Sequence, residues 1–245
     1  MDTTQAKPIL EVAHYQKRYG NKVAVRDLSL AVEAGDIYGF IGHNGAGKTT
    51  LIRSIVGVQG IDSGTIRVCG ADVAKNPLEA KRLIAYVPDN PNVYEFMTGL
   101  QYLTYIADIF NVDATTRQRR IGELAERLDL TAALGDPVGT YSHGMRQKLV
   151  LMSAFVHEPR LLVLDEPFVG LDPVASHELK RMLHELAERG SAVFFSSHVL
   201  EVVEKLCNKV AIIRAGELMA AGPTNEVRGN ESLEEIFLDL VEKEE

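Results

Sequence analysis

The segment GHNGAGKT at residues 42–49 has the spacing G-x-x-x-x-G-K-T, and it lies between the apolar segments IYGFI and TTLIRSIVG. It is therefore predicted to be a loop between a strand and a helix. Backbone N–H groups of such a loop can surround a phosphate, Lys48 adds positive charge beside the β- and γ-oxygens, and the Thr49 hydroxyl can hold magnesium. This predicts a nucleotide phosphate site. The residues predicted to contact the nucleotide here are Gly42, His43, Asn44, Gly45, Ala46, Gly47, Lys48, Thr49 and Thr50.

Two adjacent carboxylates follow a second apolar segment, LLVLDEP at residues 161–167. The four apolar residues predict a buried strand that delivers Asp165 and Glu166 to the sheet edge where ligands bind. Asp165 is expected to reach magnesium directly or through water, and Glu166 to polarise water for in-line attack on a γ-phosphate. The alternative is that two acids simply begin a surface loop.

A histidine ends a third apolar segment, SAVFFSSH, where His198 follows the predicted strand. The same sheet edge then carries an imidazole that can hydrogen-bond a γ-phosphate and respond to its loss. A purely structural capping role is the alternative. Lys48, Glu166 and His198 are thus the predicted catalytic residues.

The segment TYSHGMRQKLVLMSAF, residues 140–155, predicts a helix that begins at Ser142. Serine is a favourable N-cap, and Leu149, Met152 and Val156 recur at helical spacing. The N–H groups exposed near residues 142–144 favour an anion. An ordinary capped helix that binds nothing is the alternative.

Periodicity divides the chain into three parts. Short apolar or alternating segments separated by Gly and Asn turns make the first ninety residues strand-rich, and residues 98–157 show helical spacing. After Pro159, strands alternate with helices, which predicts parallel strands joined by crossover helices. The C-terminal segment ESLEEIFLDLVEKEE is predicted to be a docked terminal helix, because a membrane-surface helix favours basic residues.

The composition and the net charge argue against several classes of protein. With 245 residues, 46% of them hydrophobic, the chain can form a real core, and its formal net charge of −8 disfavours nonspecific nucleic-acid binding. Its start has no secretory pattern and its apolar runs are too short to span a bilayer, so a soluble protein in a reducing cytoplasm is expected. Cys69 and Cys207 indicate neither zinc nor a disulfide framework, and both are predicted to be buried.

The order of these motifs resembles the ATP-binding cassette (ABC) ATPases over nearly the whole chain. GHNGAGKTTL is similar to the Walker A motif of that family, LLVLDEP to Walker B, GLDP at residues 170–173 to the D-loop, and YSHGMRQ to the signature motif. His198 corresponds to the switch histidine. Tyr19 lies where the family stacks an aromatic ring on adenine.

The resemblance implies an α/β fold: a P-loop NTPase core with a mostly parallel sheet, an N-terminal antiparallel β subdomain and an inserted helical subdomain. One ABC domain is expected over residues 1–245. The core is expected at residues 1–88 and 158–245, and the helical insert, which carries the signature, at residues 89–157.

In that family two domains pair head to tail, and the signature helix of one caps the γ-phosphate held by the other. The resemblance therefore assigns Ser142, His143, Gly144 and Met145 to the ATP of a partner subunit. Because the chain has one phosphate loop and one signature, two chains are required, as a homodimer or a heterodimer.

The chain departs from the common family pattern at two places. The signature Leu-Ser-Gly-Gly-Gln becomes Tyr141-Ser142-His143-Gly144-Met145, which keeps the serine and the second glycine and with them the expected capping of ATP. Asp89 replaces a glutamine that senses magnesium and the membrane subunit. An aspartate can bind magnesium but cannot donate a hydrogen bond, so its coupling role is left open.

These variants resemble ATPase subunits of bacterial exporters for drugs, antibiotics or lipids. The resemblance implies ATP and Mg²⁺ as cofactors and a multi-span permease as partner, with the chain cytoplasmic and held at the inner face of the membrane. Asp89, Tyr94, Glu95 and Phe96 are the expected contacts with that permease. A soluble ABC ATPase that uses ATP-driven clamping without transport is the alternative, and a P-loop kinase is a third.

Overall fold

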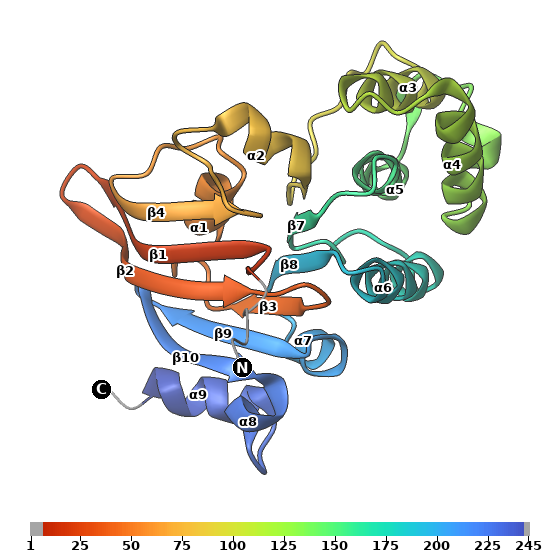
Figure 1. The fold of residues 1–245 in the computed structure, drawn as a ribbon. Helices are drawn as coiled ribbons and strands as arrows, with labels where there is room; N and C mark the ends of the chain where they lie inside the picture. The colour runs from red at the N-terminus through yellow and green to blue at the C-terminus, as the bar shows by residue number, and fades with distance from the viewer. Residues whose placement is uncertain (1–6, 243–245) are drawn as a thin grey trace, which may run out of the picture.

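The computed structural model describes residues 7–242, and Figure 1 shows two β-sheets with helices around them. The strands are β1 (Leu10–Tyr19), β2 (Lys22–Val32), β3 (Ile37–Ile41), β4 (Ser63–Val68), β5 (Ala71–Asp72), β6 (Ile84–Val87), β7 (Leu161–Asp165), β8 (Ala192–Ser197), β9 (Lys209–Arg214) and β10 (Glu217–Pro223). The helices are α1 (Lys48–Ile55), α2 (Pro77–Leu83), α3 (Gly99–Ile109), α4 (Ala114–Arg127), α5 (His143–Phe155), α6 (Pro173–Glu188), α7 (Leu200–Leu206), α8 (Thr224–Arg228) and α9 (Leu233–Glu242). Two 3₁₀ turns, η1 (Thr131–Ala133) and η2 (Val138–Thr140), precede α5.

The larger sheet has the strand order β10-β9-β3-β8-β7-β6, in which β9, β3, β8, β7 and β6 are parallel and β10 is antiparallel to β9. All five residues of β3 and of β7 are buried, as expected for parallel strands covered on both faces. The predicted, mostly parallel sheet is thus confirmed. Its carboxyl edge carries the ends of β3, β7 and β8 side by side.

The smaller sheet has the order β2-β1-β4-β5 and is antiparallel throughout. This confirms the predicted antiparallel part near the N-terminus. The two-residue turn between β1 and β2 pairs Tyr19 with Lys22, so both side chains lie at one end of the sheet.

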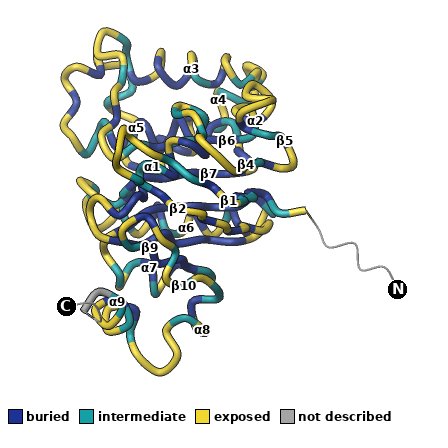
Figure 2. The backbone as a smooth tube through the Cα atoms, turned by 90° about the vertical axis from the view of Figure 1, so that its left-hand side faces the viewer, coloured by how far each residue is buried: buried dark blue, intermediate teal, exposed yellow. Residues whose placement is uncertain are grey.

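The larger sheet separates two hydrophobic cores. Leu161 and Val163 of β7 point into the core shared with α1 and the antiparallel sheet, whereas Leu162 and Leu164 point into the core shared with α3–α7 and α9. The alternation follows from the period of two in a strand. Figure 2 shows the buried strands as the dark central part of the molecule.

Helices α3, α4 and α5 lie together at one end of the molecule (Figure 1). Their buried residues, among them Leu103, Leu124 and Leu149, belong to the same cluster as one face of the parallel sheet. Arg127 of α4 also forms ion pairs with Glu178 and Glu185 of α6. Its Nη1 atom lies 2.8 Å from Glu185 Oε2. The helices that lead to the signature segment are therefore packed onto the core, while the exact bounds 89–157 of the insert stay a prediction.

The prediction that both cysteines are buried is wrong for Cys69. Cys207 is buried, and burial raises the pKa of its thiol. Cys69 is exposed because, with Gly70, it forms the turn between β4 and β5, where both residues have a left-handed backbone (φ 49° and 87°). Turn residues lie at the surface, and the apolar pattern TIRVCG does not show where the strand ends.

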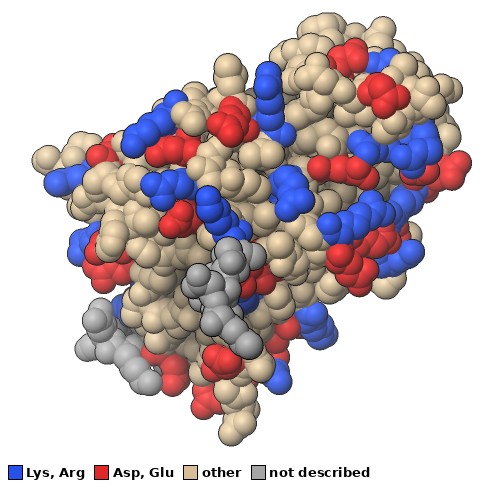
Figure 3. Space-filling view, viewed as in Figure 1, with Lys and Arg blue, Asp and Glu red and all other residues tan. Residues whose placement is uncertain are grey.

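Charged residues of both signs are interspersed over the face shown in Figure 3. Among residues 7–242, none of the helices is both long and apolar enough to cross a bilayer.

Candidate functional site

The loop after β3 is shaped by glycines that approach other backbone segments. A Cβ atom at Gly42 would lie 2.5 Å from the Ile213 carbonyl oxygen, and one at Gly47 would lie 2.8 Å from that of Ala24. Both distances are too short for any side chain. Gly47 also has φ 115° and is the N-cap of α1, which has no side-chain cap, so the first N–H groups of α1 are available to an anion.

Lys48 begins α1 and turns back into this loop. Its Nζ atom donates to the carbonyl oxygens of Gly42 (2.6 Å) and His43 (3.3 Å). Burial lowers the pKa of Lys48, while Glu166 and Asp165 act in the opposite direction. The loop thus holds a buried cation at its centre, close to two carboxylates.

Asp165 ends β7 and lies directly beside the start of α1. Its two carboxylate oxygens accept from the Thr49 hydroxyl (3.0 Å) and the Ser196 hydroxyl (2.5 Å). Ser196 was not predicted; it stands opposite Asp165 in the parallel register of β7 and β8. Both residues come at the ends of apolar segments, but their contact depends on which strands are neighbours in the sheet.

Glu166 has a strained backbone and an unsatisfied side-chain oxygen. Its φ of 51° is unusual for glutamate and costs about 1–3 kcal/mol, and its N–H lies 3.2 Å from the Ser196 hydroxyl. Oε2 lies 3.0 Å from His198 Nδ1, whereas Oε1 is buried with no hydrogen-bond partner. Unpaired buried oxygens are rare because they are costly, so Glu166 combines two unfavourable features, and such features cluster at functional sites.

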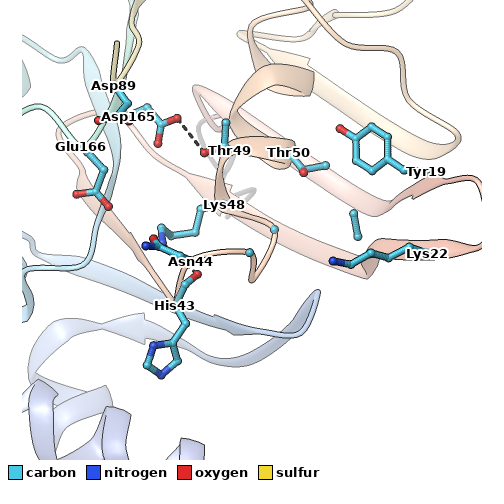
Figure 4. A pocket seen from close by; sticks show the side chains of 13 residues that line it. Tyr19, Lys22, His43, Asn44, Lys48, Thr49, Thr50, Asp89, Asp165 and Glu166 are labelled. Atoms are coloured by element: carbon cyan, nitrogen blue, oxygen red, sulfur yellow. Dashed lines mark hydrogen bonds between the residues drawn. The ribbon is translucent and has the colours of Figure 1, made fainter.

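These residues surround a cavity of about 300 Å³ (Figure 4). Its lining brings together most of the predicted site: Tyr19, His43, Asn44, Gly45, Gly47, Lys48, Thr49, Thr50, Asp89, Asp165 and Glu166. Lys22 and Ala24 also line it and were not predicted, although the Gly-Asn turn that pairs Tyr19 with Lys22 is visible in the sequence. His198 lies in an adjoining cavity with Gly42, His43 and Asn44.

Tyr19 forms the outer rim of the cavity, on the side away from the carboxylates (Figure 4). Its side chain is half exposed, its hydroxyl donates to the Gln59 side chain, and Lys17 Nζ lies 5.9 Å from the ring centroid. The ring therefore offers an accessible aromatic face at one end of a cavity whose other end is polar and charged.

The chemistry of the inner end fits a phosphate chain with magnesium. A hydroxyl and a carboxylate oxygen stand side by side at Thr49 and Asp165, and Mg²⁺ favours a few such oxygens combined with substrate phosphates. No cluster of three or more His, Cys, Asp or Glu residues that could hold a metal is present in the described part of the chain. The oxygens of Thr49 and Asp165 therefore suit a metal ion that is also bound by the phosphates of the nucleotide.

The signature residues do not line this cavity. Ser142 is the N-cap of α5 as predicted, with its hydroxyl accepting from the Met145 N–H (3.3 Å), and Ser142 and His143 are exposed. A Cβ at Gly144 would lie 3.0 Å from the Gly170 carbonyl oxygen. The helix N-terminus therefore sits against residues 170–173 and faces outward.

Comparisons with known proteins agree with this geometry. A family model described as ABC transporter matches residues 25–169. The chain is 38% identical over 221 residues to the bacitracin transport ATP-binding protein BcrA of Bacillus licheniformis, covering 90% of this chain and 71% of that protein. It is 35% identical over 213 residues to the Nod factor export ATP-binding protein I of Burkholderia orbicola (strain AU 1054), covering 87% and 70%. A solved structure of the ATP-binding subunit of an ABC transporter matches with a TM-score of 0.93 and 31% identity, covering 96% of this chain and 100% of that one.

The family model covers more than half of the chain, and the match to the solved structure extends over nearly all of it. These findings confirm the predicted resemblance and the predicted α/β fold. The chain therefore belongs to the ABC transporter family, as an ATP-binding subunit that hydrolyses ATP.

Proposed function

We propose that this chain binds ATP with Mg²⁺ in the cavity lined by Lys48, Asp165 and Glu166. Hydrolysis of that ATP drives export through a separate membrane subunit. One observation carries the assignment of the site. Glu166 lines the same cavity as Lys48, Thr49 and Asp165, so a carboxylate with a strained backbone, a buried cation and a hydroxyl–carboxylate oxygen pair converge where the γ-phosphate and its attacking water would be.

Each residue then has a role. The loop N–H groups and Lys48 bind the β- and γ-phosphates, Thr49 and Asp165 hold the metal, and Tyr19 stacks on the adenine. Bound Mg²⁺ would neutralise phosphate charge. Asp89 is exposed at the cavity edge, where its carboxylate can bind metal-associated water.

Glu166 orients the attacking water and accepts its proton. His198 Nδ1 lies 3.0 Å from Oε2, which holds the carboxylate in place beside the cavity. In-line attack then needs little movement of the protein, and such positioning is the main contribution of proteins to phosphoryl transfer.

Lys48→Ala tests the phosphate site directly. Loss of a charged hydrogen-bond donor costs about 1.5–3 kcal/mol, so we expect ATP binding by the isolated chain to weaken about 10- to 100-fold in isothermal titration calorimetry. Lys75, an exposed residue of the β5–α2 turn, gives the matched control Lys75→Ala, which should bind as wild type. Equal affinity of the two variants would contradict the proposed site.

The signature segment completes the site from a second subunit. Ser142, His143, Gly144 and Met145 do not line the cavity of their own chain, so the N–H groups at the start of α5 can reach a γ-phosphate only across an interface. We therefore propose a head-to-tail pair of ATPase subunits, identical or related, that closes on ATP and opens after hydrolysis.

The direction of transport and the location of this chain are proposed from its relatives. Two of them are named for bacitracin transport and for Nod factor export. We accordingly place this chain at the inner face of the cell membrane, held there by a permease that spans it.

The surface that meets the permease is proposed to lie around α3. Phe96 is 79% exposed, Tyr94 is about half exposed, and their ring centroids lie 5.8 Å apart, with Tyr105 of α3 at 5.9 Å from Tyr94. A cleft of about 430 Å³ lies between β6 and the helices α3 and α5. Exposed aromatic clusters beside a cleft are typical of protein interfaces.

Tyr94→Ala should uncouple transport and leave ATP hydrolysis by the isolated chain unchanged, because the ring lies on the surface outside the nucleotide cavity. Transport by vesicles that contain the permease should fall at least about tenfold if Tyr94 is a central contact. Glu95 is less suitable, since it pairs with Arg146 of α5 at 3.2 Å. Met219→Ala, on the exposed side of β10, is the control, and transport equal to that control would refute the contact.

A further inference from the structure

The C-terminal helix α9 is fixed to the core near both of its ends. The Leu233 N–H donates to Glu204 Oε2 of α7 at 3.0 Å, and Arg214 Nη1 of β9 donates to the Leu240 carbonyl oxygen at 2.5 Å. Leu233 is fully buried and Phe237 is 9% exposed. The predicted docking of this helix is confirmed for its described residues; residues 243–245 of the predicted segment lie outside them.

Phe237, between these two anchors, contacts the phosphate loop. Its ring centroid lies 4.7 Å from that of His43, with an interplanar angle of 52°. Figure 4 shows the His43 ring turned away from Lys48, toward the pale blue C-terminal part of the chain. Together with Gly42, Asn44, His198 and Leu200, the two rings line a cavity of about 310 Å³ beside the nucleotide cavity.

His43 links this contact to Lys48. While its side chain lies on Phe237, its carbonyl oxygen accepts from the Ala46 N–H (3.1 Å) and from Lys48 Nζ (3.3 Å). A rotation of residue 43 would therefore move an acceptor of the lysine and an internal hydrogen bond of the loop. Asn44 and Gly45, the next two residues of the loop, are also exposed.

The anchors of α9 and of the loop are adjacent in β9. The Ile213 carbonyl oxygen is the atom that packs over Gly42, and the next residue, Arg214, holds the end of α9. The helix and the loop therefore both contact β9, which holds Phe237 beside residues 42–44.

We propose that Phe237 is a positioning residue for ATP binding, which acts through His43 to hold the phosphate loop in the conformation that presents Lys48. This inference rests on the proposed phosphate site. A contact that preorganises the loop equally for ATP and for the transition state affects KM rather than kcat. An aromatic pair of this kind corresponds to a change of about 3- to 10-fold.

The test compares Phe237→Ala, Phe237→Tyr and Leu238→Ala in the full chain. Leu238 is 47% exposed on the same helix and is the matched control. We expect KM for ATP to rise about 3- to 10-fold in Phe237→Ala with kcat within about twofold, and to be restored by Phe237→Tyr, which keeps the ring. A KM equal to that of Leu238→Ala, or a loss confined to kcat, would overturn the proposal.

A second measurement does not depend on removing the ring. The chain contains no tryptophan, so Phe237→Trp places its single tryptophan against His43, where its emission can be excited apart from that of the tyrosines. Its emission should change when ATP binds, whereas that of Leu238→Trp should not. Unchanged emission in a Phe237→Trp variant that binds ATP would refute the coupling. If the wild-type chain itself binds ATP no better than Lys48→Ala, the proposed phosphate site fails, and this inference fails with it.

Discussion

We expect Glu166→Gln to lower the rate of ATP hydrolysis about 100- to 10,000-fold while leaving ATP affinity close to that of wild type. The amide has the size and shape of the carboxylate, so the strained backbone at residue 166 and its hydrogen bond to Ser196 are kept. It cannot accept a proton from the attacking water, as the carboxylate can. Chemistry is therefore lost and binding is retained.

Two measurements check this expectation. Phosphate release gives the hydrolysis rate, and size-exclusion chromatography with and without ATP shows whether an ATP-bound pair of chains accumulates when hydrolysis is blocked. Glu79→Gln, an exposed residue of α2, controls for the loss of one negative charge. Hydrolysis by Glu166→Gln at the rate of that control would remove Glu166 from the mechanism.

The second large effect is expected from mixing two inactive variants. Lys48→Ala removes the phosphate clamp, and Ser142→Asp places a negative charge where the γ-phosphate of the partner subunit would lie. Aspartate is as good an N-cap as serine, so α5 should keep its capped start. This choice avoids Gly144, where an added Cβ would press on the Gly170 carbonyl of the same chain at 3.0 Å.

Each variant alone should be nearly inactive, because every site carries one lesion. After equimolar mixing and subunit exchange, half of the dimers are mixed, and each of these has one site with both lesions and one with neither. If the sites act independently, about a quarter of the wild-type activity should return. Ser142→Asn keeps the cap without the charge and should be less impaired than Ser142→Asp.

A site completed within one chain predicts a different result. No intact site could then arise. The mixture would be no more active than the mean of the two separate variants, even when mass spectrometry confirms that mixed dimers have formed. Strict coupling of two sites would give the same low activity. ATP trapping separates them, since a strictly coupled mixed dimer still clamps one nucleotide and a cis arrangement does not.

The sequence by itself determined the features that depend on one element and its end. The glycine spacing and Lys48 place a phosphate loop before a helix, the apolar segment before Asp165 and Glu166 makes a buried strand, and Ser142 caps a helix. Each is set by backbone geometry and hydrogen bonds among residues close in the chain, so local patterns predict it. The alternation after Pro159 likewise predicts the parallel strands.

The tertiary structure alone decided which strand ends lie side by side and which hydrogen-bond partners each side chain has. Sequence did not show that Ser196 bonds Asp165, that His198 holds one oxygen of Glu166 while the other is left unpartnered, or that Phe237 lies on His43. These contacts join segments far apart in the chain, and their geometry is fixed by how strands pair and helices pack around a shared core, which residue order does not specify locally.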